Sequence, residues 1–227
     1  MDYIELNDYF AQVGLPEAGR HLVMKARREA PVRDVVSRLG NVISHYQSRK
    51  MRKTVIAESL HVEFPAFIQY EHDPNVLEYH PQPLMFDLRL VDPISKKVSR
   101  LQHTPDVLVL RRNSVCIDEW KDEKQMEQRA TKYPHRYRKD GGRWRDPQIE
   151  DHLNPFGIDY CIRTSSEHPV ILVQNLRFLS DYYAPEATSV SQEALAQIHK
   201  CLEEHAEISI ADLIELGRTS AQAASDG

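Results

Sequence analysis

Short runs of apolar residues predict an α/β core in the middle of this chain. The runs at residues 107–110 and 115–117 are rich in β-branched side chains, and a polar turn at residues 111–114 separates them. This pattern predicts an antiparallel hairpin. Further strands are expected at residues 76–79, 83–91 and 98–103, all in one sheet, and at residues 158–163 and 170–173.

Helical spacing of apolar positions predicts helices on both sides of these strands. An apolar stripe of Ile56, Leu60, Phe64 and Phe67 predicts a helix over residues 55–71. Residues 31–53 are polar, basic and poorly periodic, which indicates an extended arm. Other helices are expected at residues 2–12, 16–30, 122–132, 147–154 and 175–183.

The sequence changes character at residue 185. Residues 191–204 predict an amphipathic helix with Ser189 or Ser191 as its N-cap. A second helix is expected over residues 210–216, with Ser209 as its N-cap and Gly217 as its stop signal. We therefore expect three parts: N-terminal helices with a basic arm (1–53), an α/β core (54–184) and a small acidic helical module (185–227).

Bulk composition narrows the class of protein. A chain of 227 residues is long enough for one sizeable core. It contains no run of about 18 apolar residues, so we expect no membrane span, and its acidic start predicts no export signal. The cysteines Cys116, Cys161 and Cys201 have no zinc-site spacing, and the first two lie in apolar runs. We expect these two to be buried thiols in a reducing cytoplasm.

Cationic residues are concentrated in two segments, although the net charge of the chain is −5. Residues 1–56 hold ten Lys and Arg against six Asp and Glu, and residues 129–145 hold seven against one. Residues 146–227 hold four against fourteen. Basic clusters favour nucleic acid, whereas the acidic module suits a protein partner. The candidate DNA-binding residues are Arg49, Lys50, Arg52, Lys53, Lys132, Arg136, Arg138, Lys139, Arg143 and Arg145.

The hairpin carries the most informative chemistry of the chain. Glu119 and Lys121 are two residues apart on a strand and therefore share a face, and folding brings Asp106 beside Glu119. Acid-x-Lys triplets are common in a chain that is 28% charged. This triplet is more informative because an acid at the head of the preceding strand adds a second carboxylate beside it. Two carboxylates suit Mg²⁺, and a lysine suits a phosphodiester or its attacking water.

Several further motifs stand in order along residues 31–183. They are Ser48-Arg49-Lys50-Met51 leading to Glu58-Ser59-Leu60-His61-Val62-Glu63; Asp73-Pro74-Asn75-Val76-Leu77-Glu78-Tyr79-His80-Pro81-Gln82-Pro83; Thr104-Pro105-Asp106; Ile117-Asp118-Glu119-Trp120-Lys121; Gly157 to Thr164; and Asn175-Leu176-Arg177-Phe178-Leu179. Together they resemble the TnsA-type endonucleases, which are subunits of heteromeric cut-and-paste transposases.

The resemblance implies a restriction-endonuclease-like α/β fold of the PD-(D/E)xK type, with a mixed central sheet flanked by helices. It assigns catalytic roles to Glu63, Asp106, Glu119 and Lys121, and it assigns binding of Mg²⁺ or Mn²⁺ to the first three. Two positions depart from the family's pattern. His61-Val62 leaves Glu58 as the alternative to Glu63, and Trp120 replaces a small apolar residue and is expected to crowd or shape the site.

The implied activity is metal-dependent hydrolysis of double-stranded DNA at the 5′ ends of a transposon, in the bacterial cytoplasm. The implied partners are a TnsB-type DDE transposase, which cuts and joins the 3′ ends, and a TnsC-type AAA+ ATPase. Two alternatives stay open: a stand-alone restriction or repair nuclease of the same fold, and a non-catalytic DNA-binding subunit.

Overall fold

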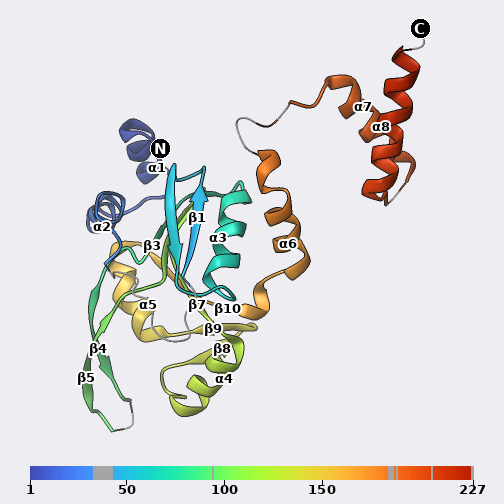
Figure 1. Ribbon diagram of the computed structural model, residues 1–227. Helices are drawn as coiled ribbons and strands as arrows, with labels where there is room; N and C mark the ends of the chain where they lie inside the picture. Colours follow the sequence, from blue (N-terminus) through green and yellow to red (C-terminus); the bar gives the residue numbers. More distant parts are fainter. Residues whose placement is uncertain (33–42, 94, 184–186, 188, 206, 226–227) are drawn as a thin grey trace. The chain divides into compact units, whose positions relative to one another are not determined.

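The computed structural model describes residues 1–32, 43–93, 95–183, 187, 189–205 and 207–225 (Figure 1). The chain divides into two compact units, Met1–Phe178 and Leu179–Gly227. Among the described helices, none is both long and apolar enough to cross a membrane.

A mixed sheet of six strands forms the centre of the first unit. The strand order is β3-β6-β7-β10-β9-β8, and β7 and β10 are its parallel pair. The strands are β3 (Val76–Pro81), β6 (Val107–Arg111), β7 (Ser114–Lys121), β10 (Asp159–Thr164), β9 (Arg143–Arg145) and β8 (Arg138–Asp140). The expected α/β class with a mixed sheet is therefore confirmed.

The predicted hairpin is formed by β6 and β7. Leu108 lies opposite Ile117, and Val107 lies opposite Asp118. Since side chains alternate along a strand, Leu108 and Ile117 enter one core cluster, whereas Val107 and Val109 enter the cluster on the other face. All four are fully buried, so the hairpin is covered on both sides.

Four helices supply the core on the first face of the sheet. They are α1 (Tyr3–Gln12), α2 (Glu17–Arg28), α4 (Glu123–Lys132) and α5 (Pro147–Leu153), all close to prediction. Asp2 begins α1 with a capping box that it shares with Glu5. Leu6 and Phe10 of α1 pack in the same cluster as the sheet, so the N-terminal helices belong to the first unit rather than standing apart.

The second face is covered by α3 (Glu63–His72) and a two-stranded ribbon, and α6 (Val170–Phe178) packs beside α3 (Figure 1). The ribbon pairs β1 (Ser44–Ser48) with β2 (Lys53–Ala57). The predicted helix over residues 55–71 is therefore wrong in its first half, because residues 53–57 pair as a strand. The predicted arm is wrong over residues 44–53, and residues 33–42 lie outside the described residues.

Two other sequence predictions need correction. The pair β4 (Phe86–Val91) and β5 (Val98–His103) forms a ribbon of its own, not strands of the main sheet. Residues 170–173 do not form a strand but begin α6, which packs against α3. Residues 138–145, for which the sequence analysis named no element, form the hairpin of β8 and β9.

Two α-helices lie among the described residues of the second unit. The first is α7 (Gln192–Glu204), and Ser191 caps it by accepting a hydrogen bond from the Ala194 N–H, as predicted. The second is α8 (Ile210–Ser225), which continues through Gly217. The predicted stop at Gly217 is wrong, because a glycine weakens a helix without ending it.

Lys50 holds the turn between β1 and β2 onto the sheet. Its Nζ donates to the backbone carbonyls of Tyr70, Asp73 and Val76 at 2.6–2.7 Å. These carbonyls lie at the end of α3 and the start of β3. Burial lowers the pKa of Lys50, against the opposing charge of Glu71. The ammonium group therefore has a structural role at this position.

Lys50→Met should lower the free energy of unfolding by about 3 kcal/mol, because three carbonyls lose a charged donor. Chemical denaturation measures this value. Lys97→Met, which removes an exposed lysine, serves as the control and should change stability by less than about 0.5 kcal/mol. Equal stability of the two variants would show that the carbonyls do not depend on Lys50.

Candidate active site

Asp106, Glu119 and Lys121 meet at one end of two inner strands of the sheet, where β6 begins and β7 ends. Lys121 Nζ lies 2.6 Å from Glu119 Oε1 and 3.2 Å from Asp106 Oδ2. Asp106 continues the face of Leu108, and Glu119 continues the face of Ile117. The hairpin thus brings together the three residues that the sequence pattern selected.

Glu63 reaches the same cluster from α3. It is the first residue of that helix, where the unpaired N–H groups favour a negative charge. Its Oε2 accepts a hydrogen bond from the backbone N–H of Glu58 at 2.7 Å. The carboxylate is therefore held by the strand-to-helix turn, and not by a position inside a long helix as predicted.

Glu58 is attached to the cluster through Gln82. Gln82 Nε2 donates to Glu58 Oε1 at 2.5 Å, and the Gln82 N–H donates to the carbonyl of Asp106 at 2.8 Å. Gln82 has a φ of 44°, a conformation that costs energy for a residue with a side chain. One oxygen of Glu58 and one oxygen of Glu63 thus each accept a hydrogen bond in this turn, and Glu58 stays the alternative to Glu63.

The hydrogen bond from the Gln82 N–H to the Asp106 carbonyl also fixes the end of β3 against the start of β6. It follows directly on the last register pair of these strands, Pro81 with Val107. The strained residue and the first site carboxylate are therefore placed by the same backbone contact. Strain of this kind is typical of functional sites.

His103 is a site residue that the sequence reading missed. It ends β5, and its Nε2 lies 3.4 Å from Glu119 Oε2. Both atoms are buried, and neither has a hydrogen-bond partner among the described residues. The only sequence signal was a histidine just before Thr104-Pro105-Asp106, and the approach of this histidine to Glu119 depends on the path of the β4–β5 ribbon.

Burial, together with neighbouring negative charge, raises two pKa values in the cluster. Burial raises the pKa of Glu63 to about 7, and the nearby charge of Asp106 adds to this effect. Burial likewise raises the pKa of Asp106 to about 6, together with the charge of Glu119. Both carboxyl groups therefore titrate close to neutral pH, which is a common property of functional sites.

Glu119 and Lys121 form the ionised pair of the cluster. Burial alone would raise the pKa of Glu119, but the charge of Lys121 and the imidazole of His103 lower it to about 2. Burial would lower the pKa of Lys121, but Glu119 and Asp106 raise it above its usual range. One ammonium group thus faces three carboxyl groups.

Trp120 does not crowd the cluster, because its side chain lies on the opposite face of β7. Its ring stacks on His168 with centroids 4.4 Å apart, and its Nε1 donates to the Tyr70 hydroxyl. Its backbone N–H donates to Asp106 Oδ2 at 2.7 Å. The expectation that Trp120 shapes the site therefore holds only through its backbone.

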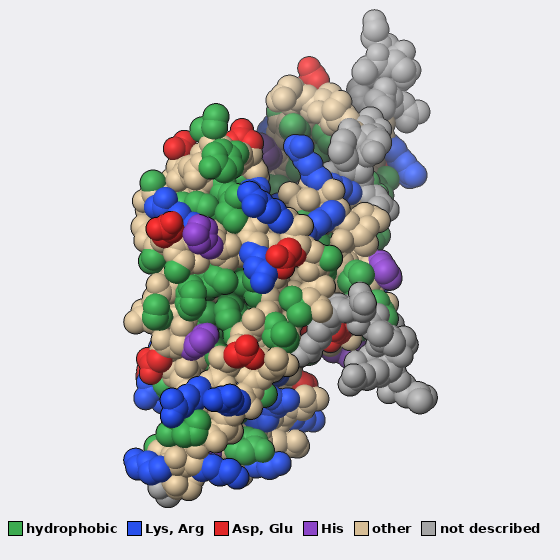
Figure 2. Space-filling view, turned by 90° about the vertical axis from the view of Figure 1, so that its left-hand side faces the viewer, with side chains coloured by type: hydrophobic (Ala, Val, Ile, Leu, Met, Phe, Trp, Pro, Cys, Tyr) green, Lys and Arg blue, Asp and Glu red, His purple; other side chains and the backbone are tan. Residues whose placement is uncertain are grey.

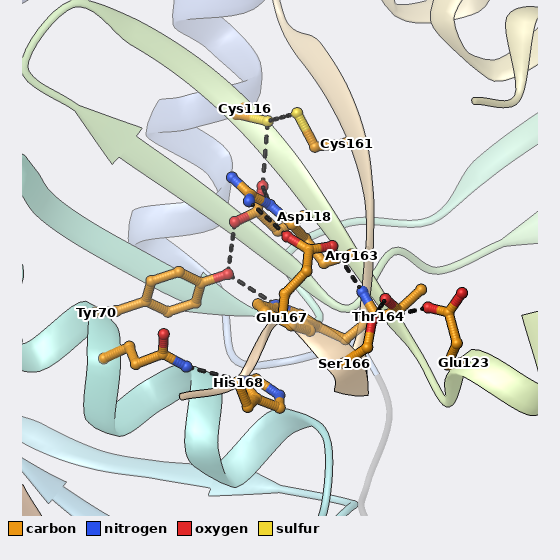
Figure 3. A network of polar contacts seen from close by, with 12 residues as sticks. Tyr70, Cys116, Asp118, Glu123, Cys161, Arg163, Thr164, Ser166, Glu167 and His168 are labelled. Carbon is orange, nitrogen blue, oxygen red and sulfur yellow. Dashed lines mark hydrogen bonds and ion pairs between the residues drawn. The ribbon is translucent and has the colours of Figure 1, made fainter. Parts of the chain in front are cut away.

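Asp118 belongs to a separate buried network on that opposite face (Figure 3). Its Oδ2 accepts hydrogen bonds from the Tyr70 hydroxyl and from Arg111, both at 2.6 Å. The Cys116 sulfur lies 3.2 Å from its Oδ1. Asp118 is fully buried and its charge is compensated, so it serves the fold.

The predicted DNA-binding residues differ in how far they are already engaged. Lys50 is bound to carbonyls, Arg136 is paired with Asp146 at 2.6 Å, and Arg145 is paired with Glu150 at 2.5 Å. Lys139 lies 3.5 Å from Glu123. Arg138 and Arg143 are exposed on β8 and β9. The exposed set is thus smaller than the predicted set.

A cavity of about 300 Å³ adjoins the cluster. Glu119 and Lys121 line it on one side, and Arg129 and Arg136 line it on another. Arg129 lies on α4 and was not among the predicted contacts. Cations beside the carboxylates give this cavity the charge pattern that suits an anionic group next to a cation site.

No protein-family model and no curated protein matches this chain. The geometry of the site therefore carries the functional argument.

Glu63→Gln should stabilise the protein at pH 8 by about 2 kcal/mol in the presence of a chelator. The folded-state pKa of about 7 exceeds the ordinary value of 4.5. The stability that the neutral Glu63 carboxyl contributes to the unchanged protein is therefore complete below pH 4.5, and it is lost as the pH rises through 7 and the carboxyl ionises. Chemical denaturation from pH 4.5 to 8 measures it, and the gain should disappear at pH 4.5.

Glu127→Gln is the matched control, since Glu127 is exposed on α4. It should leave the stability difference independent of pH. If Glu63→Gln is no more stable than the unchanged protein at pH 8, the crowding of charge at Glu63 is refuted.

Proposed function

We propose that this protein is a metal-dependent endonuclease that hydrolyses DNA phosphodiester bonds. The observation that supports this most directly is the cluster of Glu63, Asp106, Glu119 and Lys121 at the end of a hairpin in a mixed sheet. This is the arrangement expected of a restriction-endonuclease-like fold, and the motifs that carry it resemble those of TnsA-type subunits.

The residues of the cluster fit a hard divalent cation. Three carboxyl groups carry three negative charges when ionised, and Lys121 compensates one of them. Glu119 Oε2 is buried without a hydrogen-bond partner among the described residues. Oxygen ligands of this kind are those that Mg²⁺ and Mn²⁺ prefer. We assign Glu63, Asp106 and Glu119 as the metal ligands.

When bound, the metal would polarise a phosphoryl oxygen and lower the pKa of a water molecule. The residues of the chain supply the other parts of the reaction. Lys121 is oriented by Glu119 and Asp106 and would stabilise the charge that grows on the phosphate. Glu63, whose pKa is about 7 without a metal, would be held ionised by the positive charge of the metal that it binds.

The ribbon of β4 and β5 supports a DNA-binding surface next to this site. Arg89 and Arg100 lie opposite each other and are exposed, and Lys96 and Lys97 are exposed at the turn. Figure 2, which views the side of the molecule that carries the β4–β5 ribbon, shows Lys and Arg side chains gathered at its lower end, where this ribbon lies. Two like charges in register are unfavourable unless an anion lies between or beside them.

The ribbon is connected directly to the site through His103, the last residue of β5. A two-stranded ribbon fits the major groove of B-form DNA. We therefore include Arg89, Arg100, Lys96 and Lys97 in the proposed DNA contacts, together with Arg138 and Arg143. The ribbon would hold the duplex while the cluster faces one strand.

The resemblance leads us to propose further that the DNA is a transposon end, cut at its 5′ strand inside an assembly with a TnsB-type transposase and a TnsC-type ATPase. The second unit supports a protein partner rather than DNA, since residues 179–227 hold nine Asp and Glu against two Lys and Arg. A net charge of −5 for the chain also favours weak DNA binding without a partner.

Lys121→Met should reduce Mg²⁺-dependent strand cleavage of a transposon-end duplex by at least about 100-fold. It should keep the rise in the unfolding temperature that Mg²⁺ produces in the unchanged protein. Asp106→Asn should lose both cleavage and the Mg²⁺ effect, because it removes a charged ligand and keeps an acceptor for the Trp120 N–H.

The assay is run with and without a TnsB-type transposase that recognises the same transposon end. Cutting of the 5′ strand only with the transposase supports the transposase-subunit proposal, whereas cutting of any duplex by the chain alone supports a stand-alone nuclease. A protein that neither cuts nor responds to Mg²⁺ would be a DNA-binding subunit without catalysis, and the enzyme proposal would fail.

The double substitution Arg89→Ala and Arg100→Ala should weaken binding of duplex DNA by about tenfold at moderate salt and reduce the salt slope of log K by nearly two. Fluorescence anisotropy measures both. The control, Lys25→Ala with Arg28→Ala, removes two exposed charges from α2. Equal effects of the two pairs would exclude a specific role for the ribbon.

A further inference from the structure

Two cysteines lie in contact on neighbouring strands of the sheet. Cys116 on β7 donates a hydrogen bond to the sulfur of Cys161 on β10, with the two Sγ atoms 3.0 Å apart (Figure 3). Cys161 lies opposite Asp118 in the parallel register, two residues along from Cys116. A small movement of the side chains is enough to bring the sulfur atoms to bonding distance.

The two thiols differ in access to solvent. Cys116 is 3% exposed, whereas Cys161 is partly exposed and lines a surface cavity of about 440 Å³. Arg143, Arg145 and Arg163 line this cavity together with Glu150, Asp151, Asp159 and Glu167. A small polar reagent therefore reaches Cys161 first.

The electrostatic surroundings distinguish the two thiols in the same way. The hydrogen bond from Cys116 lowers the pKa of Cys161, and Arg163 and Arg111 add to this effect against burial and the charge of Asp118. The same hydrogen bond, together with burial, raises the pKa of Cys116. Cys161 is therefore the nucleophile and Cys116 the protonated partner.

A metal ion does not suit this group of residues, although ligand atoms of Cys116, Asp118 and Cys161 lie within 4.8 Å of one another. Asp118 is already hydrogen-bonded to the guanidinium of Arg111, and Arg163 Nε lies 3.9 Å from its other oxygen. Two guanidinium groups would repel a divalent cation. The arrangement favours redox chemistry instead.

We infer that Cys161 is a peroxide-reactive thiol and that it forms a reversible disulfide with Cys116. The Cys161 thiolate attacks hydrogen peroxide, so that an S–O bond forms, the O–O bond breaks and hydroxide leaves. Cys116 then attacks the sulfenic sulfur, the S–S bond forms and the S–O bond breaks. The departing oxygen takes the Cys116 proton and leaves as water. Two electrons pass from the two thiols to the peroxide.

The disulfide would join two central strands whose cysteines are 45 residues apart. One of these strands, β7, also carries Glu119 and Lys121. Oxidation would restrict the separation of β7 from β10 and should raise the unfolding temperature, because a cross-link restricts the unfolded chain. Intracellular disulfides of this reversible kind are characteristic of redox sensing.

The test treats the purified, reduced protein with hydrogen peroxide and maps its thiols by mass spectrometry. The full chain should lose two hydrogen atoms, two of its three thiols should disappear, and one peptide pair should contain Cys116 joined to Cys161. Dithiothreitol should reverse the change. The third cysteine, Cys201, lies in the second unit, and Cys201→Ser should form the same disulfide at the same rate.

Substitution of each partner separates the two roles. Cys116→Ser should leave a sulfenic acid at Cys161, trapped by dimedone about tenfold faster than at Cys201, and Cys161→Ser should leave Cys116 reduced. Retention of all three thiols in the unchanged protein, or a disulfide that includes Cys201, would overturn the inference. The mapping on the unchanged protein decides the question even if a variant does not fold.

Discussion

The register between β6 and β7 is the constraint on which both faces of the central sheet depend. Leu108 lies opposite Ile117, so Asp106 shares a face with Glu119 and Lys121. A slip of one residue would turn these charged groups into the core below α3 and would turn Asp118 toward the site. The many buried β-branched residues of the hairpin make such a slip costly, and in this way the apolar core fixes the geometry of the charged cluster.

Adjacent acids on β7 illustrate how the surroundings decide the role of a carboxylate. Asp118 accepts hydrogen bonds from Tyr70 and Arg111 at Oδ2, and its Oδ1 lies 3.2 Å from the Cys116 sulfur and 3.9 Å from Arg163 Nε. Glu119 is also buried but keeps Oε2 without a hydrogen bond among the described residues. Because an unpaired buried oxygen is unfavourable, Glu119 Oε2, with His103 Nε2 3.4 Å away, is the atom at which we propose that the metal binds.

The sequence predicted the hairpin and its cluster because both depend on local alternation and a tight turn. It did not predict that residues 53–57 form a strand, since their pairing with residues 44–48 depends on a turn held by Lys50. The helix at residues 170–173 contradicts a local β preference because α6 packs against α3. His103 was missed for a related reason: its approach to Glu119 depends on the path of a ribbon, and neighbouring residues in the sequence do not determine that path.

The raised pKa values of Glu63 and Asp106 connect stability to the proposed chemistry. At pH 8 both carboxyl groups ionise in a buried cluster that already holds Glu119, and a single ammonium group cannot compensate all three. The folded protein is then less stable than its packing alone would allow. A divalent cation that binds only the folded protein would recover this free energy. The crowding that reduces the stability of the free protein is therefore the same feature that would give the site its affinity for a metal.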